Sequence, residues 1–169
     1  TLRVEYTAPD ATEPPSSSTL ELRDVSAASG KAYTTVASLA NGDAAFIDRS
    51  VAYRDLPDWL AGTQAIQSAN DDKWSTGDRF LSFTVNQPAV VYVTHCDAIQ
   101  NPAWLSQFED TGVNVNVNET HSVYRREFAA GTVVLGGNMV SGDTFARTMY
   151  TGMVAPSDTP VADTTAPVV

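Results

Sequence analysis

Hydrophobic and polar residues alternate through most of the middle of the chain, as they do in strands that bury one face. The clearest example is "VNVNVNE" (113–119), where valines point one way and asparagines the other. "FLSFTVN" (80–86) and "AVVYVTHC" (89–96) continue the pattern on either side of a turn at Pro88. These stretches predict antiparallel strands.

Further segments show the same period of two in weaker form. They are "TLELRDVS" (19–26), "KAYTTVASL" (31–39), "DAAFIDRSVAY" (43–53), "SVYRREF" (122–128), "GTVVLGG" (131–137) and "TFARTMYTGMV" (144–154). Many short strands without long helices between them predict an all-β fold, an antiparallel β-sandwich of the jelly-roll or Greek-key type.

Two short helical insertions are expected within this fold. "PDWLAGTQAIQSA" (57–69) and "PAWLSQFED" (102–110) both open with proline, which is well tolerated in the first helical turn. Trp104 has Phe108 four residues later, so we expect Trp104 to pack into the core. Trp59 lacks such a partner, and burial is favoured there less strongly. Trp74 follows polar residues and is expected to be exposed.

The two ends of the chain differ from the middle. They are rich in Pro, Ser and Thr and poor in apolar residues, which is typical of linkers. We therefore predict three parts: the end of a preceding region with a linker at 1–18, one β-sandwich module at 19–154, and a linker to a following domain at 155–169.

Charge excludes some classes of partner. The formal net charge is −10, which repels nucleic acid and anionic membrane surfaces. No apolar run approaches the roughly 20 residues that span a bilayer. Cys96 is the only cysteine, so no intrachain disulfide can form. A monomer that contacts other domains of its own chain is expected.

Four stretches, taken in order, resemble a β-sandwich module appended to large, secreted, multi-modular bacterial proteins, many of them associated with polysaccharide breakdown. They are "DRSVAYRDLPDWLAGTQAIQSANDDK", "FLSFTVNQPAVVYVTHCD", "PAWLSQFEDTG" and "FAAGTVVLGGN". The resemblance implies a secreted, non-catalytic accessory domain, with a polysaccharide or oligosaccharide as its usual supposed ligand. It supplies no binding residues.

The segment "ANDDKWSTGD" (69–78) concentrates oxygen ligands. Asn70, Asp71, Asp72 and Asp78 could hold a structural calcium ion, which prefers oxygen-rich sites. The spacing matches no EF-hand, and the simpler interpretation is a turn in which Asp side chains bond to backbone N–H groups.

The same segment offers the best candidate for sugar recognition. An exposed indole beside carboxylates and amides suits a sugar, because the ring stacks on the pyranose while polar groups bond to its hydroxyls. The candidate contacts are Trp74 first and Trp59 second, with Asp72 and Asn116 as polar partners. For the asparagine row that contains Asn116, a plain solvent face is the simpler interpretation.

Two other classes of function stay open. One is a structural or adhesive spacer, or a protein-interaction module, without a sugar site. The other, weaker, is a metal or redox module using His95 and Cys96, although neighbours on a strand point to opposite faces. His95 is expected to be packed and His121 solvated. Paired carboxylates are abundant in an acidic chain and do not by themselves indicate a hydrolase.

Overall fold

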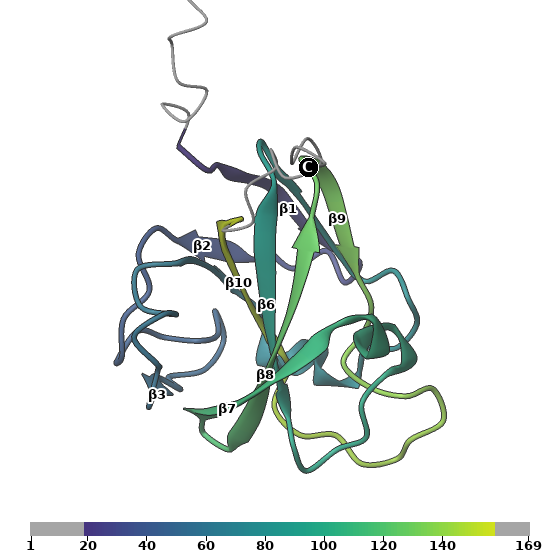
Figure 1. The fold of residues 1–169 in the computed structure, drawn as a ribbon. Coiled ribbons are helices and arrows are strands. Elements are labelled where there is room, and N and C mark those ends of the chain that lie inside the picture. The colour runs from purple at the N-terminus through teal and green to yellow at the C-terminus, as the bar shows by residue number, and fades with distance from the viewer. Residues whose placement is uncertain (1–18, 158–169) are drawn as a thin grey trace, which may run out of the picture.

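A computed structural model describes residues 19–157 and shows two antiparallel sheets packed face to face. The predicted antiparallel β-sandwich is confirmed. The linker predicted at 1–18 lies outside the described residues, as does most of the one predicted at 155–169. The first two residues of the second linker, Ala155 and Pro156, instead belong to the last strand. Figure 1 shows strands β6, β8 and β10 running side by side through the middle of the molecule. No helix in this described span is long and apolar enough to cross a membrane.

The two sheets differ in size. The smaller has the strand order β1 (Leu22–Ala27), β5 (Leu81–Val85), β9 (Gly131–Leu135). The larger has the order β2 (Thr34–Val36), β4 (Gln64–Gln67), β10 (Thr151–Pro156), β6 (Ala89–Cys96), β8 (Thr120–Phe128), β7 (Glu109–Val117), β3 (Tyr53–Arg54). All the pairs of neighbouring strands run antiparallel.

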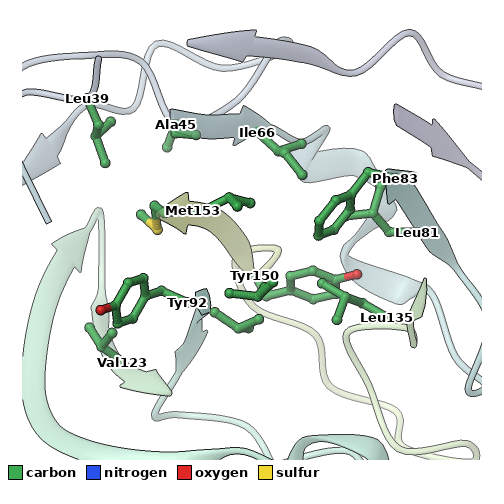
Figure 2. Packing of buried hydrophobic residues seen from close by; sticks show 14 of the residues in the cluster. Leu39, Ala45, Ile66, Leu81, Phe83, Tyr92, Val123, Leu135, Tyr150 and Met153 are labelled. Atoms are coloured by element: carbon green, nitrogen blue, oxygen red, sulfur yellow. The ribbon is translucent and has the colours of Figure 1, made fainter. Parts of the chain in front are cut away.

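The central strand β6 is covered on both faces, because all eight of its residues are buried. One face meets the smaller sheet. The segment between β2 and β4 supplies cover for the other, since Trp59 of this segment packs on the ring of Tyr92. Leu39 and Phe46 of the same segment are part of the apolar cluster that contains Tyr92. Figure 2 shows Leu39 on one side of this cluster and Phe83 of β5 on the other. The nearly continuous apolar sequence of β6 reflects this double cover.

The predicted helix at 57–69 is wrong over most of its length. A single turn forms at residues 58–62, held by the N–H groups of Leu60 and Ala61, which donate to the carbonyl of Pro57. Gly62 then adopts a φ of +85°, a left-handed conformation that ends the turn. The remaining residues form β4, whose pairing with β2 and β10 outweighs the local helical preference.

The second helical insertion is confirmed as the 3₁₀ helix η4 (Ala103–Gln107), with Pro102 just before its first residue. A further 3₁₀ helix, η3 (Asn70–Trp74), forms where the sequence predicted a loop. The first turn of η3 is held by a residue from an earlier segment of the chain, because the carboxylate of Asp48 accepts hydrogen bonds from the N–H groups of Asn70 and Asp71.

Three predicted strands are much shorter in the structure. Of residues 31–39, only Thr34–Val36 form a strand. Residues 43–53 form only isolated bridges, Ala44 with Ala52 and Phe46 with Ser68, before β3 begins at Tyr53. Of residues 144–154, only those from Thr151 onward belong to a strand. The preceding residues, 136–150, run as a long loop that is held by side chains bonding to the backbone.

This loop starts at a very close crossing of two chain segments. The N–H of Gly137 donates to the carbonyl of Gly77 at 2.8 Å, and the N–H of Met139 donates to the carbonyl of Ser75 at 2.9 Å. A Cβ atom added to Gly137 would lie only 2.4 Å from the backbone nitrogen of Thr76. Only glycine fits there, which gives the "GG" of the sequence a packing role.

Gly137→Ala should therefore lower the free energy of unfolding by about 2–3 kcal/mol, because backbone atoms rather than a flexible side chain oppose the new methyl group. The control is Gly152→Ala in β10, where an added Cβ meets nothing closer than 3.9 Å. We expect this control to change stability by less than about 0.5 kcal/mol. Chemical denaturation of both variants measures the difference. Equal stability of the two variants would contradict the close crossing.

Candidate functional site

The three tryptophans occupy three different environments. Trp104 packs against the core, with its ring centroid 5.4 Å from that of Tyr150 and 5.8 Å from that of Phe108. Its indole N–H donates to the carbonyl of Gly137 at 2.8 Å. Both the apolar ring and its polar atom are thus used within the fold, and the predicted packing of Trp104 is confirmed.

Trp59 is 44% exposed, so the predicted burial is wrong. Leu60, not Trp59, anchors the turn, because the Leu60 side chain is fully buried while the indole lies on the outside. The indole packs on the ring of Tyr92 in β6, with centroids 5.3 Å apart and planes inclined by 47°. A large apolar ring is therefore held at the surface on a nearly buried aromatic support.

A row of polar side chains continues across the sheet from Tyr92. Its antiparallel partner on β8 is Arg125, and the partner of Arg125 on β7 is Glu109, so the three side chains share one face. The Arg125 guanidinium lies 3.7 Å from a carboxylate oxygen of Glu109 and 3.9 Å from one of Glu127. These ion pairs are too long to be direct hydrogen bonds. The surface formed by Trp59, Tyr92, Arg125, Glu109 and Glu127 is called the Trp59 surface below.

Trp74 lies at the last residue of η3 and is 55% exposed, which confirms its predicted exposure. Asp72, proposed as its polar partner, is buried and faces inward. Its carboxylate accepts hydrogen bonds from Ser29 (2.7 Å), Tyr33 (2.6 Å) and Lys31 (2.8 Å). Asp72 therefore ties η3 to the segment after β1 instead of pointing toward solvent beside the indole.

The pKa of Asp72 reflects this network. Burial by itself raises the pKa of the carboxyl group, but the hydrogen bonds from Lys31, Tyr33 and Ser29 outweigh burial and hold the pKa below its usual value. The carboxylate thus stays ionised in the folded protein at neutral pH.

The other residues suggested for calcium have separate partners. Asn70 accepts a hydrogen bond from the N–H of Met149 through its side-chain oxygen, and Asp71 pairs with Arg49 at 2.5 Å. Asp78 is exposed. Within residues 19–157, no group of three or more His, Cys, Asp or Glu side chains is placed to hold a metal ion. Calcium binding stays a prediction.

Asn116 lies on β7 opposite Thr120 of β8 and Arg54 of β3, and it is half-buried. The alternation of this strand is confirmed, because Val115 and Val117 are buried. Its neighbour in the asparagine row, Asn114, accepts a hydrogen bond from Ser122. The role of Asn116 in sugar binding stays a prediction.

His95 and Cys96 do not form a joint site. Nε2 of His95 donates to the carbonyl of Asn138 at 2.8 Å, whereas Sγ of Cys96 lies 3.5 Å from a carboxylate oxygen of Glu119. His95 is buried, as predicted. Burial raises the pKa of the Cys96 thiol, which disfavours the reactive thiolate.

His121 was predicted to be solvated and is instead fully buried. It lies in the middle of a hydrogen-bonded chain that runs from Thr151 through Thr94, His121 and Thr148 to Glu119. Because Thr148 donates to the carboxylate, its hydroxyl accepts from Nε2 of His121, and Nδ1 accepts from Thr94. The alternation of His121 with buried Val123 along β8 was the signal that could have revealed this.

Comparisons with known proteins connect this fold to enzymes that cleave glycosidic bonds. No family model matches the chain. A solved β-glucuronidase of glycoside hydrolase family 2 is similar in structure, with a TM-score of 0.72 and 29% sequence identity. The likeness covers 79% of this chain and 14% of that enzyme. The chain is thus similar to one portion of a glycoside hydrolase.

A relative by sequence agrees with this. A β-glucuronidase of Formosa agariphila is 31% identical over 116 residues, which are 67% of this chain and 12% of the relative. The chain therefore spans about an eighth of the length of the proteins it matches.

Asp72→Asn should lower the free energy of unfolding by about 2 kcal/mol, mainly because the bonds from Tyr33 and Ser29 weaken in a buried setting. The ion pair with Lys31 contributes less, since Lys31 is exposed and its charge is screened. The matched control is Asp71→Asn, whose exposed ion pair with Arg49 is worth no more than about 0.5 kcal/mol. Denaturant titration compares the two variants; a larger loss for Asp71→Asn would refute the assignment.

His121 should make the fold sensitive to acid. Burial, reinforced by the nearby His95, lowers the pKa of His121 from 6.5 to about 4. Between these two values the unfolded chain binds a proton that the folded chain does not, so the free energy of unfolding falls as pH drops from 6.5 toward 4. The contribution of neutral His121 to stability is fully present above pH 6.5. The contribution reaches about 3 kcal/mol.

The measurement is the free energy of unfolding across this pH window for the native chain and for His121→Gln. The variant should show a shallower pH dependence, by up to about one proton. The remaining slope comes mainly from His95, whose pKa burial also lowers, and near the acid end of the window from Glu119 and Asp72. These groups are common to both proteins. Identical slopes would mean that His121 does not titrate in this window.

Proposed function

We propose that this chain is a non-catalytic β-sandwich domain of a secreted glycoside hydrolase, and that it binds carbohydrate through exposed tryptophan. The parent enzyme would act on glucuronides, by analogy with the β-glucuronidases that the chain resembles. The domain would act as a monomeric unit beside the catalytic domain of the same chain.

The exposure of two indoles carries this proposal. Trp59 and Trp74 are 44% and 55% exposed, although the same sequence buries other aromatic residues completely, such as Tyr53 and Tyr150. An exposed indole leaves a wide apolar face in water, and the C–H face of a pyranose ring is a matching partner. Polar side chains near such a ring then bond to the hydroxyl groups of the sugar.

Two observations support a non-catalytic role: the small share of each enzyme that the chain matches, and the hydrogen bonding of its least exposed carboxylates. The matched portion is 12–14% of each enzyme, so most of the enzyme lies elsewhere. The buried carboxylate Asp72 and the half-buried carboxylate Glu119 are both occupied by hydrogen bonds and ion pairs within the fold.

Docking to another domain of the same chain is the second candidate function. Ile47 and Phe145 are also exposed apolar residues, at 39% and 58%, and a domain interface would cover such side chains. In that case the domain would be a spacer without a sugar site.

Affinity electrophoresis in gels that contain soluble polysaccharides tests the proposal. The panel is xylan, β-glucan, galactomannan, polygalacturonate and alginate. We expect retardation by at least one glycan, and roughly a tenfold weaker affinity in Trp59→Ala or in Trp74→Ala, because removal of a stacking ring removes its contact area.

Phe145→Ala is the control, since it removes an exposed aromatic ring from another loop without touching either indole. Unchanged migration of the native chain in every gel would reject carbohydrate binding and leave the docking function in place.

A further inference from the structure

The Trp59 surface combines a rigid aromatic platform with a row of polar side chains. We propose that this surface is the sugar-binding site and that its ligand is an uncharged sugar residue of a polysaccharide, rather than a uronate. This inference rests on the carbohydrate-binding function proposed above and adds both the location of the site and the chemical class of the ligand.

The platform is fixed before any ligand arrives. The turn that carries Trp59 is closed by the bond from the N–H of Leu60 to the carbonyl of Pro57, and by a second bond from Thr63 Oγ1 to the carbonyl of Leu60. The N–H of Gly62 and the carbonyl of Leu39 join the turn to the neighbouring segment. A turn held in this way loses little backbone freedom when a ligand binds to its indole, which favours affinity.

The support under the platform is equally firm. Tyr92 belongs to the central strand β6 and is only 9% exposed, so its ring is locked between the sheet and the indole. Trp74 has no comparable support: among the described residues, ring-to-ring contacts involve Trp59 and Trp104 but not Trp74. Trp74 also lacks the polar partner expected for it, because Asp72 points inward.

The polar row begins at the cross-strand neighbour of Tyr92, the residue that supports the indole, and supplies both donors and acceptors. Arg125 is the cross-strand neighbour of Tyr92, and 34% of its side chain is exposed. Glu109 and Glu127 flank it, with side chains 73% and 40% exposed. Guanidinium N–H groups donate to sugar hydroxyl oxygens and carboxylates accept from hydroxyl groups, so the three residues suit a polyhydroxylated ring.

Charge decides between the two classes of sugar. The row holds two carboxylates and one guanidinium, which gives a local charge of −1, in a chain whose net charge is −10. The positive charge of Arg125 is already balanced by carboxylates 3.7 Å and 3.9 Å away. A uronate would meet net repulsion here, whereas a neutral sugar can bond to the exposed guanidinium and carboxylate groups of the row without that repulsion.

Isothermal titration of the 169-residue chain tests this, with neutral oligosaccharides from xylan, β-glucan and galactomannan compared against oligogalacturonate and oligomannuronate. We expect binding to a neutral oligosaccharide that weakens roughly tenfold in Trp59→Ala and severalfold in Arg125→Gln. Affinity should change less than about twofold between ~0.05 and ~0.5 M NaCl, because no net charge is exchanged. Trp59→Phe, which keeps an apolar ring, should retain more affinity than Trp59→Ala.

The carboxylates provide a second, independent readout. In the double variant Glu109→Gln/Glu127→Gln, the preference for neutral over acidic oligosaccharides should fall at least about threefold, because the repulsion is removed. Denaturation midpoints of all variants show that each is folded.

The outcomes separate the two proposals. Binding of acidic oligosaccharides in preference to neutral ones would overturn the ligand class, and a larger loss in Trp74→Ala than in Trp59→Ala would overturn the location. In both cases carbohydrate binding itself would stand. Absence of binding to every glycan would remove the proposed function together with this inference.

Discussion

The rest of the structure depends on the burial of strand β6 on both faces. An eight-residue strand without a solvent face needs apolar cover on each side, and one sheet can supply only one side. The smaller sheet covers the first face. The segment between β2 and β4 helps to cover the second, and this explains why so much chain with little regular structure occurs there. The turn that carries Trp59 belongs to this segment.

The loop at 136–150 is held by hydrogen bonds from polar side chains. These bonds replace the strand pairing that the sequence pattern predicts for residues 144–150. The loop at 136–150 is buried at both ends, and buried backbone groups must find partners. Asn138 supplies several: its side chain accepts from the N–H of Tyr150 and donates to the carbonyl of Lys73, while its own carbonyl accepts from His95. The histidines are thus part of how the loop is fixed, and neither lies in a surface site.

The class of fold could be predicted from the sequence, because alternation is a local property and most strands carry it. The valine and asparagine run of β7 and the apolar run of β6 are the clearest cases. The sequence pattern could not show that residues 57–69 form no helix. That outcome depends on the pairing of Gln64–Gln67 with strands that lie far away in the chain.

For the candidate site, the exposure of Trp74 was predictable from its polar neighbours. The support of Trp59 by Tyr92 was not, because it joins residues that only the folded chain brings together.

The two copies of the Pro-x-Trp-Leu sequence show how the same local motif acquires two roles. In both copies the leucine is buried, and the turn or short helix that follows the proline is anchored by it. Whether the tryptophan is covered depends on which other segment of the chain packs over its ring. Over Trp104 the loop that begins at Gly136 crosses closely and accepts a hydrogen bond from the indole. Trp59 stays 44% exposed. Of the two indoles that follow a proline in this motif, Trp59 is therefore the one whose ring remains partly open to solvent.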